Sequence, residues 1–427
     1  MQLKTKLVQF GAGNIGRSFV GQLFSAAGYE VVFVDVDKAL IQALNRERAY
    51  RVEIRDRENR TIRVENVRAV DAADVEEVVK EIASASICAA AVGPMFLPDL
   101  FPVLAGGVKL RYELGGGPLD IILCENLRNA ADITRQGLRE LLPAGFPVDT
   151  YLGLVETSIG KMVPIIPAEV RQKDPLTVYA EAYNTLILDR RGFVNEVPRV
   201  KGLDAKENMK AYVDRKSFIH NLGHAALAYY SHLVAPEMVY TYEAVEDPEI
   251  RSWVNRAMGE SGCLLIEMYP GEFNQRNQQD HIQDLLNRFG NRVLGDTIHR
   301  VGRDLKRKLA AEDRVVGPLL EGWKRGLEAP WTVHSLTCGL FFQAPGPDGL
   351  PFPADKEIVY RAKNESPGAV LRELCRLPEP LISIVSNAYA MIQKSRSPQG
   401  AINRKRFLDV LRFTERELKH VSQRTRT

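Results

Sequence analysis

The pattern of apolar and polar positions changes near residue 200. Before that point, short apolar runs alternate with amphipathic segments. The apolar runs lie at 6–10, 31–34, 86–92, 119–124, 150–155 and 177–188. Runs of this length, bounded by turn residues and separated by helical segments, are typical of buried parallel strands. The first part of the chain is therefore predicted to be a Rossmann-type α/β domain with a doubly wound, mostly parallel sheet.

From Ala205 onward, the apolar residues follow a helical period. Helices are expected at 206–233, 247–269, 277–289, 305–325, 367–376, 379–395 and 401–423. The proline-rich stretch Pro345–Pro353 predicts a loop. We expect Pro198–Asp204 to link a nucleotide-binding domain at 1–200 to a mainly α-helical domain at 201–427.

Composition narrows the classes of protein to consider. A chain of 427 residues is too long for one compact core and predicts two domains. A net charge of +3 gives no electrostatic reason to expect nucleic-acid binding. No run of eighteen apolar residues and no signal peptide are found, so we expect no membrane association. The five cysteines are scattered and odd in number, which fits neither a disulfide framework nor a zinc site. This cysteine usage favours a reducing compartment, and we expect a cytoplasmic protein.

A glycine-rich loop follows the first predicted strand and opens a helix. Its residues are Gly11, Ala12, Gly13, Asn14, Ile15 and Gly16. The first glycine permits a tight turn, the second lets the backbone approach a pyrophosphate, and the third allows close packing of helix and strand. Asp35 ends the second strand, where a carboxylate binds the adenosine ribose and repels a 2′-phosphate. The loop therefore predicts an NAD site.

Two later strands also end in candidate ligands. Val92 ends one of them and is followed by Gly93, and Asn126 lies just after another. Ligands of doubly wound sheets bind at the carboxyl edge of the strands, so Val92 and Gly93 are expected to lie against the nicotinamide ribose. Asn126 is either a donor to the substrate or cofactor, or an asparagine that caps a turn.

A segment in the helical part carries an amine, an amide and an imidazole within nine residues. On an α-helix, Asn221 and His224 lie about 140° and 80° of rotation from Lys216, so all three line one wall of a pocket. His220 and His224 have a spacing that suits a metal, but the glutamate of the metalloprotease helix is replaced by Asn221. We therefore expect no metal.

A basic cluster follows at residues 300–308. Arg300, Arg303 and Arg307 have helical spacing, and Lys308 is adjacent. Guanidinium groups bind phosphates and carboxylates bidentately, so the cluster suits the anionic end of a small substrate. A solvated basic helix face is the alternative interpretation.

These motifs together resemble the polyol-specific long-chain dehydrogenase/reductase family, in particular its mannitol-1-phosphate 5-dehydrogenase-like branch. The resemblance is carried by residues 10–17, 91–94, 124–126, 215–224 and 300–309, which occur in the expected order. It implies hydride transfer without zinc, with Lys216 as general acid/base. It further implies that Asn126 and Asn221 hold the reacting oxygen, that His224 orients the substrate hydroxyls, and that Arg300 and Lys308 contact its distal part.

The sequence departs from the family pattern at two places. Gly160 and Lys161 stand where an Asp-Arg pair is expected, and Asp214 stands where a glutamate is expected before the catalytic lysine. Loss of the acid at Gly160 removes an acceptor for a substrate hydroxyl. This departure bears on the choice of substrate and not on the hydride-transfer chemistry.

The resulting hypothesis is an NAD-dependent oxidoreductase that interconverts mannitol 1-phosphate and fructose 6-phosphate. Other substrates remain open, among them a hexitol without phosphate and a hexuronate such as tagaturonate or fructuronate. Two further alternatives are a hydroxyacid or opine-type dehydrogenase and a non-catalytic NAD-sensing protein. The first needs a catalytic histidine–carboxylate pair and is disfavoured by the Lys/Asn/Asn set, and the second is disfavoured by the intact Lys216, Asn221 and His224. The expected partner is a small polyol or ketose, and nothing demands more than a monomer or weak homo-oligomer.

Overall fold

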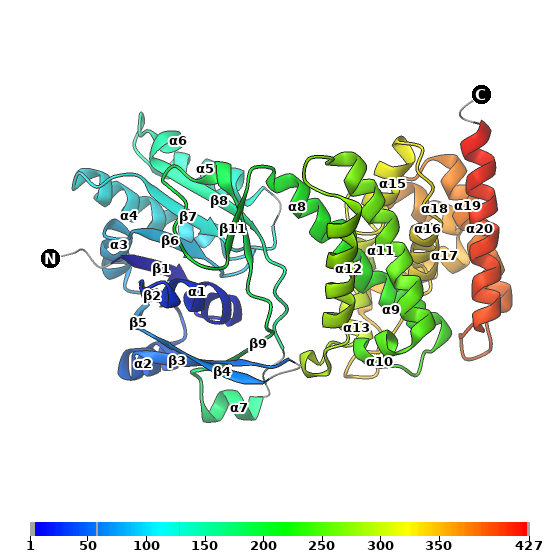
Figure 1. The fold of residues 1–427 in the computed structure, drawn as a ribbon, viewed down its shortest axis with the longest axis horizontal. Coiled ribbons are helices and arrows are strands. Elements are labelled where there is room, and N and C mark those ends of the chain that lie inside the picture. The colour runs from blue at the N-terminus through cyan, green and yellow to red at the C-terminus, as the bar shows by residue number, and fades with distance from the viewer. Residues whose placement is uncertain (1–4, 57–58, 128, 165, 167, 425–427) are drawn as a thin grey trace. The chain divides into compact units, whose positions relative to one another are not determined.

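The computed structural model describes residues 5–56, 59–127, 129–164, 166 and 168–424. The chain divides into two compact units, Met1–Tyr212 and Val213–Thr427. The first contains strands and helices, and the described part of the second is built from helices (Figure 1). This confirms the predicted fold class, a Rossmann-type α/β domain followed by a mainly helical one.

The main sheet of the first unit has eight strands within the described residues, in the order β11-β10-β8-β7-β6-β1-β2-β5. Only the pair β8 and β10 is antiparallel among the described strand pairs of this sheet. The strands are β1 (Lys6–Phe10), β2 (Glu30–Asp35), β5 (Val67–Asp71), β6 (Ile87–Ala90), β7 (Leu119–Leu123), β8 (Leu152–Ser158), β10 (Leu186–Asp189) and β11 (Leu203–Lys206). The parallel strands therefore present their carboxyl ends along one edge.

A small second sheet was not predicted. It has the order β4-β3-β9, with β3 at Ala49–Ile54, β4 at Arg60–Glu65 and β9 at Thr177–Ala180. The strand-like run at 177–188 therefore forms two strands, β9 and β10, which pair in different sheets. The expected linker Pro198–Asp204 runs into β11, whose parallel pairing with β10 keeps it in the first unit.

Alternate residues of the central strands enter two separate hydrophobic cores. Leu7 of β1 packs in one core, and Val8 and Phe10 pack in the other. The helical elements of this unit are a π-helical turn at Gly16–Gly21, α1 (Gln22–Ala26), α2 (Lys38–Glu47), α3 (Val75–Ala83), α4 (Phe101–Glu113), α5 (Ala130–Leu141), α6 (Val148–Tyr151) and α7 (Ala168–Lys173). The first core contains α1 and α2 residues, and the second contains residues of α3, α4 and α5. Both faces are thus covered, as a doubly wound sheet requires.

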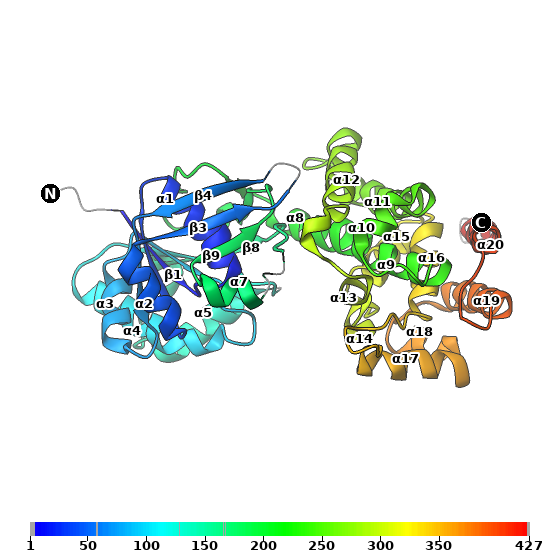
Figure 2. The same ribbon diagram turned by 90° about the horizontal axis from the view of Figure 1, so that it is seen from below.

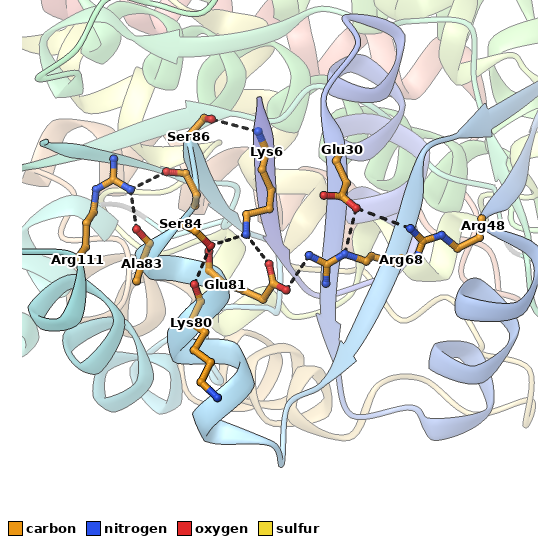
Figure 3. Close-up of polar contacts among 11 residues, drawn as sticks. Lys6, Glu30, Arg48, Arg68, Lys80, Glu81, Ala83, Ser84, Ser86 and Arg111 are labelled. Carbon is orange, nitrogen blue, oxygen red and sulfur yellow. Dashed lines mark hydrogen bonds and ion pairs between the residues drawn. The ribbon is translucent and has the colours of Figure 1, made fainter. Parts of the chain in front are cut away.

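A charged network closes the opposite, amino-terminal edge of this sheet (Figure 3). The buried Glu81 of α3 accepts from Lys6 Nζ and pairs with Arg68, at 2.6 Å in each case. Arg68 Nε continues to Glu30 at 3.1 Å, and Arg48 lies 3.7 Å from the same carboxylate. Burial alone raises the pKa of Glu81, but hydrogen bonds from Lys6 and Arg68 lower it overall. Glu81 is therefore held as a carboxylate that ties α3 to the sheet.

The second unit is organised around α9 (Leu222–Val234), whose residues are mostly buried. This helix packs against α11, α13 and α16. The other helices are α8 (Met209–Arg215), which spans the boundary, α10 (Thr241–Glu246), α11 (Pro248–Met268), α12 (Gln275–Phe289), α13 (Ile298–Gly302), α14 (Leu305–Lys308), α15 (Val316–Lys324), α16 (Pro330–Gly339), α17 (Pro353–Asn364), α18 (Pro367–Glu373), α19 (Glu379–Ser395) and α20 (Arg404–Arg424). Throughout the described part of the chain, no helix is long and apolar enough to cross a membrane.

The helix predicted at 305–325 is wrong as one element. It consists of α14, a turn, and α15, which begins only at Val316. Asp313 lies in that turn and accepts hydrogen bonds from the backbone and Nε of Arg314, at 2.6 and 2.7 Å. A short polar side chain that bonds the neighbouring backbone competes with helix formation, which explains the interruption.

Candidate active site

The glycine loop after β1 has the shape that a dinucleotide pyrophosphate requires. Gly11 has a φ of 85°, and a Cβ there would lie 2.5 Å from the carbonyl oxygen of Ala91. A Cβ at Gly16 would lie 2.0 Å from the carbonyl oxygen of Gly11. A Cβ at Gly13, in contrast, would meet nothing within 4 Å. Gly13 therefore leaves open space beside a helix N-terminus, where the phosphates of NAD fit.

The helix that follows begins at Asn14 and widens into the π-helical turn at Gly16. Ile15 packs against the hydrophobic core, so the start of this helix is fixed. Arg17 is buried below the loop, and its guanidinium donates to Ala12 O at 2.6 Å and to Pro175 O at 2.8 Å. Burial lowers the pKa of Arg17 to about 10, which leaves it charged at neutral pH. Arg17 therefore fastens the loop to the rest of the unit.

Asp35 lies next to the loop at the end of β2. Its Oδ2 accepts from Ala12 N at 2.6 Å, and its Oδ1 accepts from the N–H groups of Val36 and Asp37 at 2.8 and 3.0 Å. Three backbone donors therefore fix the carboxylate at the end of β2, where the dinucleotide-binding fingerprint has its acidic residue. A negative charge at this place opposes the 2′-phosphate of NADP.

Glu125 shapes the carboxyl edge near Val92 and Gly93. It is buried at the end of β7, and its Oε1 accepts from Val92 N at 2.8 Å and from Gly93 N at 3.2 Å. Burial raises the pKa of Glu125, although these two hydrogen bonds oppose the rise. Asn126 follows directly and is exposed at this edge. The predicted cofactor residues of the first unit thus follow one edge of its sheet.

Lys216 and Asn221 lie at the two ends of a second π-helical turn, between α8 and α9. The N–H of Leu222 donates to Ser217 O, five residues earlier, as the π geometry requires. The rotation of about 140° expected between Lys216 and Asn221 is therefore wrong, since it assumes an α-helix. Because residues five apart are adjacent along a π turn, the amine and the amide belong to the same face.

The environment of Lys216 shifts its proton equilibrium toward the neutral form. Burial and the nearby charge of Arg314 lower the pKa of this lysine from 10.5 to about 8. A lysine with a pKa near the working pH is able both to accept and to return a proton. Lys216 therefore has the electrostatic property that a general acid/base needs.

His224 has a buried ring nitrogen without a partner. Its Nε2 has no hydrogen-bond partner among the described residues, and its ring lies on Phe289 with centroids 3.9 Å apart. The pKa of His224 is lowered well below its ordinary value by burial and then by four cations. These are Arg300, Arg314, Lys308 and Arg288. A neutral imidazole with an unused nitrogen can exchange a hydrogen bond with a substrate hydroxyl.

Three of these cations, Lys308, Arg300 and Arg314, are held by different contacts. Lys308 is 4% exposed, and its ammonium donates to Val301 O at 2.6 Å. Arg300 pairs with the buried Asp296, and Arg314 donates through Nε to Asp313 at 2.7 Å. The pKa of Lys308 falls to about 7, first through burial and then through the charges of Arg314 and Arg307. An anion in this cluster would relieve the repulsion among its members.

The basic residues do not form one continuous helix, contrary to the helical spacing expected for them. After α13 the chain is extended at Arg303 and left-handed at Asp304, with φ of 73°, before α14 begins. The basic side chains around this interruption therefore lie in different environments. Arg307 pairs with Asp304 at 2.7 Å and Arg303 lies over the Phe352 ring, whereas Lys308 is buried. Arg300 and Lys308 are among the cations that lower the pKa of His224, although only Lys308 of the two is buried.

The two departures from the family pattern have local structural roles. Lys161 is buried in the first unit, where its Nζ donates to Tyr183 O at 2.8 Å and to Asn184 Oδ1 at 2.9 Å. Asp214 is buried in the second unit and accepts from Tyr269 Oη at 2.6 Å. Both side chains are therefore engaged in the packing of their own unit.

Several residues of these two sites were missed by the sequence reasoning. They are Arg17, Glu125, Arg288 and Arg314. Arg17 and Glu125 stand inside the stretches that carry the resemblance, which could have marked them. Arg288 and Arg314 come from separate elements, and no spacing in the sequence links them to His224.

Two family models match the sequence in succession. The model described as the mannitol dehydrogenase Rossmann domain matches residues 5–202, and the model of the mannitol dehydrogenase C-terminal domain matches residues 208–348. A mannitol-1-phosphate 5-dehydrogenase from Geobacillus stearothermophilus is 34% identical over 336 residues, which cover 78% of this chain and 85% of that protein.

Solved structures share the fold at lower identity. A substrate-free D-sorbitol dehydrogenase has a TM-score of 0.75 and 16% identity, covering 97% of this chain and 95% of its own. The mannitol 2-dehydrogenase of Pseudomonas fluorescens, in a ternary complex with NAD and D-mannitol, has a TM-score of 0.61 and 14% identity, covering 99% and 95%. Together with the family matches, these findings confirm the resemblance and the enzyme class predicted from the sequence, an NAD-dependent polyol dehydrogenase.

Proposed function

Because the chain belongs to the mannitol dehydrogenase family, we propose that it interconverts mannitol 1-phosphate and fructose 6-phosphate. The observation that carries this choice is a group of cations, Arg300, Lys308 and Arg314, whose charges lower the pKa of His224. A phosphate monoester brings about two negative charges at neutral pH, and cations bind such a group through charge-assisted hydrogen bonds. The relative from Geobacillus stearothermophilus, named for the same phosphorylated polyol, supports the choice.

The glycine loop would hold NAD, which would supply the hydride acceptor for the carbon that carries the reacting hydroxyl. Lys216 takes the hydroxyl proton in the oxidation direction and returns it in the reduction direction. A pKa of about 8 keeps a useful fraction of both its forms near neutral pH. The positive charge of the oxidised nicotinamide favours the neutral amine further.

The remaining polar side chains orient the substrate. We assign Asn221 and Asn126 as amide donors to the oxygen that becomes negative as the hydride leaves. His224, held neutral by burial and the surrounding cations, offers its unused Nε2 to a substrate hydroxyl. Arg300 and Lys308 bind the distal phosphate.

A hexuronate, or a hexitol without phosphate, is the second candidate. Arg300 is paired with Asp296, which leaves less positive charge for a dianion. A carboxylate carries one charge and fits such a partly neutralised cluster. The same acid/base chemistry would then act on a different substrate.

A substrate panel tests the proposal. NADH consumption is measured with fructose 6-phosphate, fructose, tagaturonate and fructuronate. We expect the highest kcat/KM with fructose 6-phosphate; equal or better turnover of fructose, or of a hexuronate, would refute the phosphate assignment.

The role of Lys216 has its own test. Lys216→Ala should lower kcat by about 10²-fold or more while the Kd for NADH changes little, because only proton transfer is lost. Lys306→Ala, at an exposed lysine of α14, is the matched control and should retain activity. Near-normal turnover of Lys216→Ala removes this residue from the proposed role.

A further inference from the structure

Helix α14, which carries Lys308, is too short to be stable alone. It has four residues, Leu305–Lys308, and starts from the left-handed Asp304. Nucleation of a helical turn is unfavourable, and an isolated turn of this length does not persist in water. The position of Lys308 therefore depends on contacts outside its own helix.

Asp355 supplies such a contact. It is the third residue of α17, which lies beside α14 (Figure 2). Its Oδ2 accepts from Asp304 N at 3.0 Å and its Oδ1 accepts from Leu305 N at 2.6 Å. The residue is 1% exposed, so water does not compete for these bonds. One buried carboxylate thus caps the N-terminus of α14 from a different helix.

Asp355 acts on Lys308 in two ways, through the backbone of α14 and through its own negative charge. Lys308 N donates to Asp304 O at 3.0 Å, so the capped residue is also the first acceptor of the turn. The charged groups that act on the Lys308 ammonium are Arg314, Arg307, Asp304 and Asp355. The charge of Lys308 in turn lowers the pKa of His224. The two arginines favour the neutral amine, whereas the two aspartates favour the charged form.

We propose that Asp355 is a positioning residue for the anionic end of the substrate: it holds α14 so that Lys308 presents its ammonium at the binding cluster. This inference rests on the proposed function, in which Lys308 binds a phosphate. Asp355 lies beyond residue 348, where the match to the C-terminal domain model ends. The loop at 345–352 brings the chain to this contact.

The test compares Asp355→Asn with Lys308→Met and with the double variant. KM and kcat for fructose 6-phosphate reduction are measured from pH 6 to 9. Asp355→Asn should raise KM about tenfold, as expected for loss of a charge-assisted hydrogen bond, with kcat within about twofold. The rise of KM with pH should also begin at a lower pH, because the ammonium loses a stabilising carboxylate.

The double variant separates positioning from simple stabilisation. With Lys308 replaced by Met, Asp355→Asn should add nothing further to KM, whereas a purely structural role predicts additive effects. Asp348→Asn, in the exposed loop next to α17, is the matched control and should leave KM unchanged.

Two outcomes overturn the inference. Additive effects on KM would do so, and so would a parallel loss of kcat and NADH affinity, which reports a general loss of structure. Failure of the proposed function gives a different result, since Lys308→Met by itself would then leave KM for fructose 6-phosphate unchanged.

Discussion

Arg314 should set the pH range in which Lys216 accepts a proton. The guanidinium is buried near the lysine and, after burial itself, is the second cause of its lowered pKa. Replacing Arg314 by Gln removes the repulsion between the two cations. The pKa of Lys216 should then rise from about 8 toward its ordinary value.

The size of the effect follows from the proton equilibrium. At pH 7 a lysine with a pKa of about 8 is about one-tenth neutral, whereas one with a pKa of 10.5 is neutral in about one molecule in three thousand. Burial is the larger cause, so we assign the charge about one pH unit, or about 1.4 kcal/mol. Oxidation at pH 7 should therefore slow by about tenfold in Arg314→Gln.

The assay is the pH dependence of kcat for mannitol 1-phosphate oxidation at saturating substrate. The acid limb should lie at or below pH 8 in the parent enzyme, because the positive charge of oxidised nicotinamide would lower the pKa of Lys216 further, and it should lie higher in Arg314→Gln. Arg314→Lys keeps the charge and should keep the limb close to its original position. Arg303→Gln also removes an arginine, but one that lies over the Phe352 ring, and it is the control that should leave the limb in place. A limb that stays in place or moves to lower pH in Arg314→Gln refutes the reasoning.

Three other variants test separate parts of the structure. Asp35→Asn should raise the Kd for NADH about tenfold and that for NADPH less, in fluorescence titrations, because a charged ribose acceptor is lost; an unchanged preference contradicts the assignment. Glu125→Gln should weaken NADH binding about fivefold through the Val92–Gly93 turn, with the exposed Glu113→Gln as control. Burial lowers the pKa of His334 to about 3, below about 6.5 in the unfolded chain, so its contribution to stability is lost as pH falls through that range. The parent protein should lose free energy of unfolding between pH 7.5 and 5, and His334→Phe should lose about 2 kcal/mol less over this range, measured by urea denaturation. An equal effect of His420→Phe, at an exposed histidine, would contradict this.

The first unit was largely predictable because its signals are local. Gly11, Gly13 and Gly16 stand between two apolar runs, and Asp35 ends the second of these. The extra sheet was not predictable, since β3 and β9 pair across more than a hundred residues. Arg17 was missed for a related reason: its partner Pro175 is 158 residues away.

The second unit was harder because its site depends on interruptions of helices. An amphipathic pattern at 305–325 fits one helix, and only the contact from Asp355 and the turn at Asp313 reveal two. The charge that acts on Lys216 comes from Arg314, almost a hundred residues later in the sequence. The oligomeric state and the cytoplasmic location stay predictions.

The π-helical turn at Lys216–Asn221 makes the number of residues in this segment as important as their identity. Deletion of one residue among Ser217–His220 would let the turn close as an ordinary α turn, with the flanking helices still able to form. Lys216 would then be rotated by about 100° relative to His224. Insertions and deletions, more than substitutions at Phe218 or Ile219, are therefore the changes that would silence this enzyme while sparing its fold.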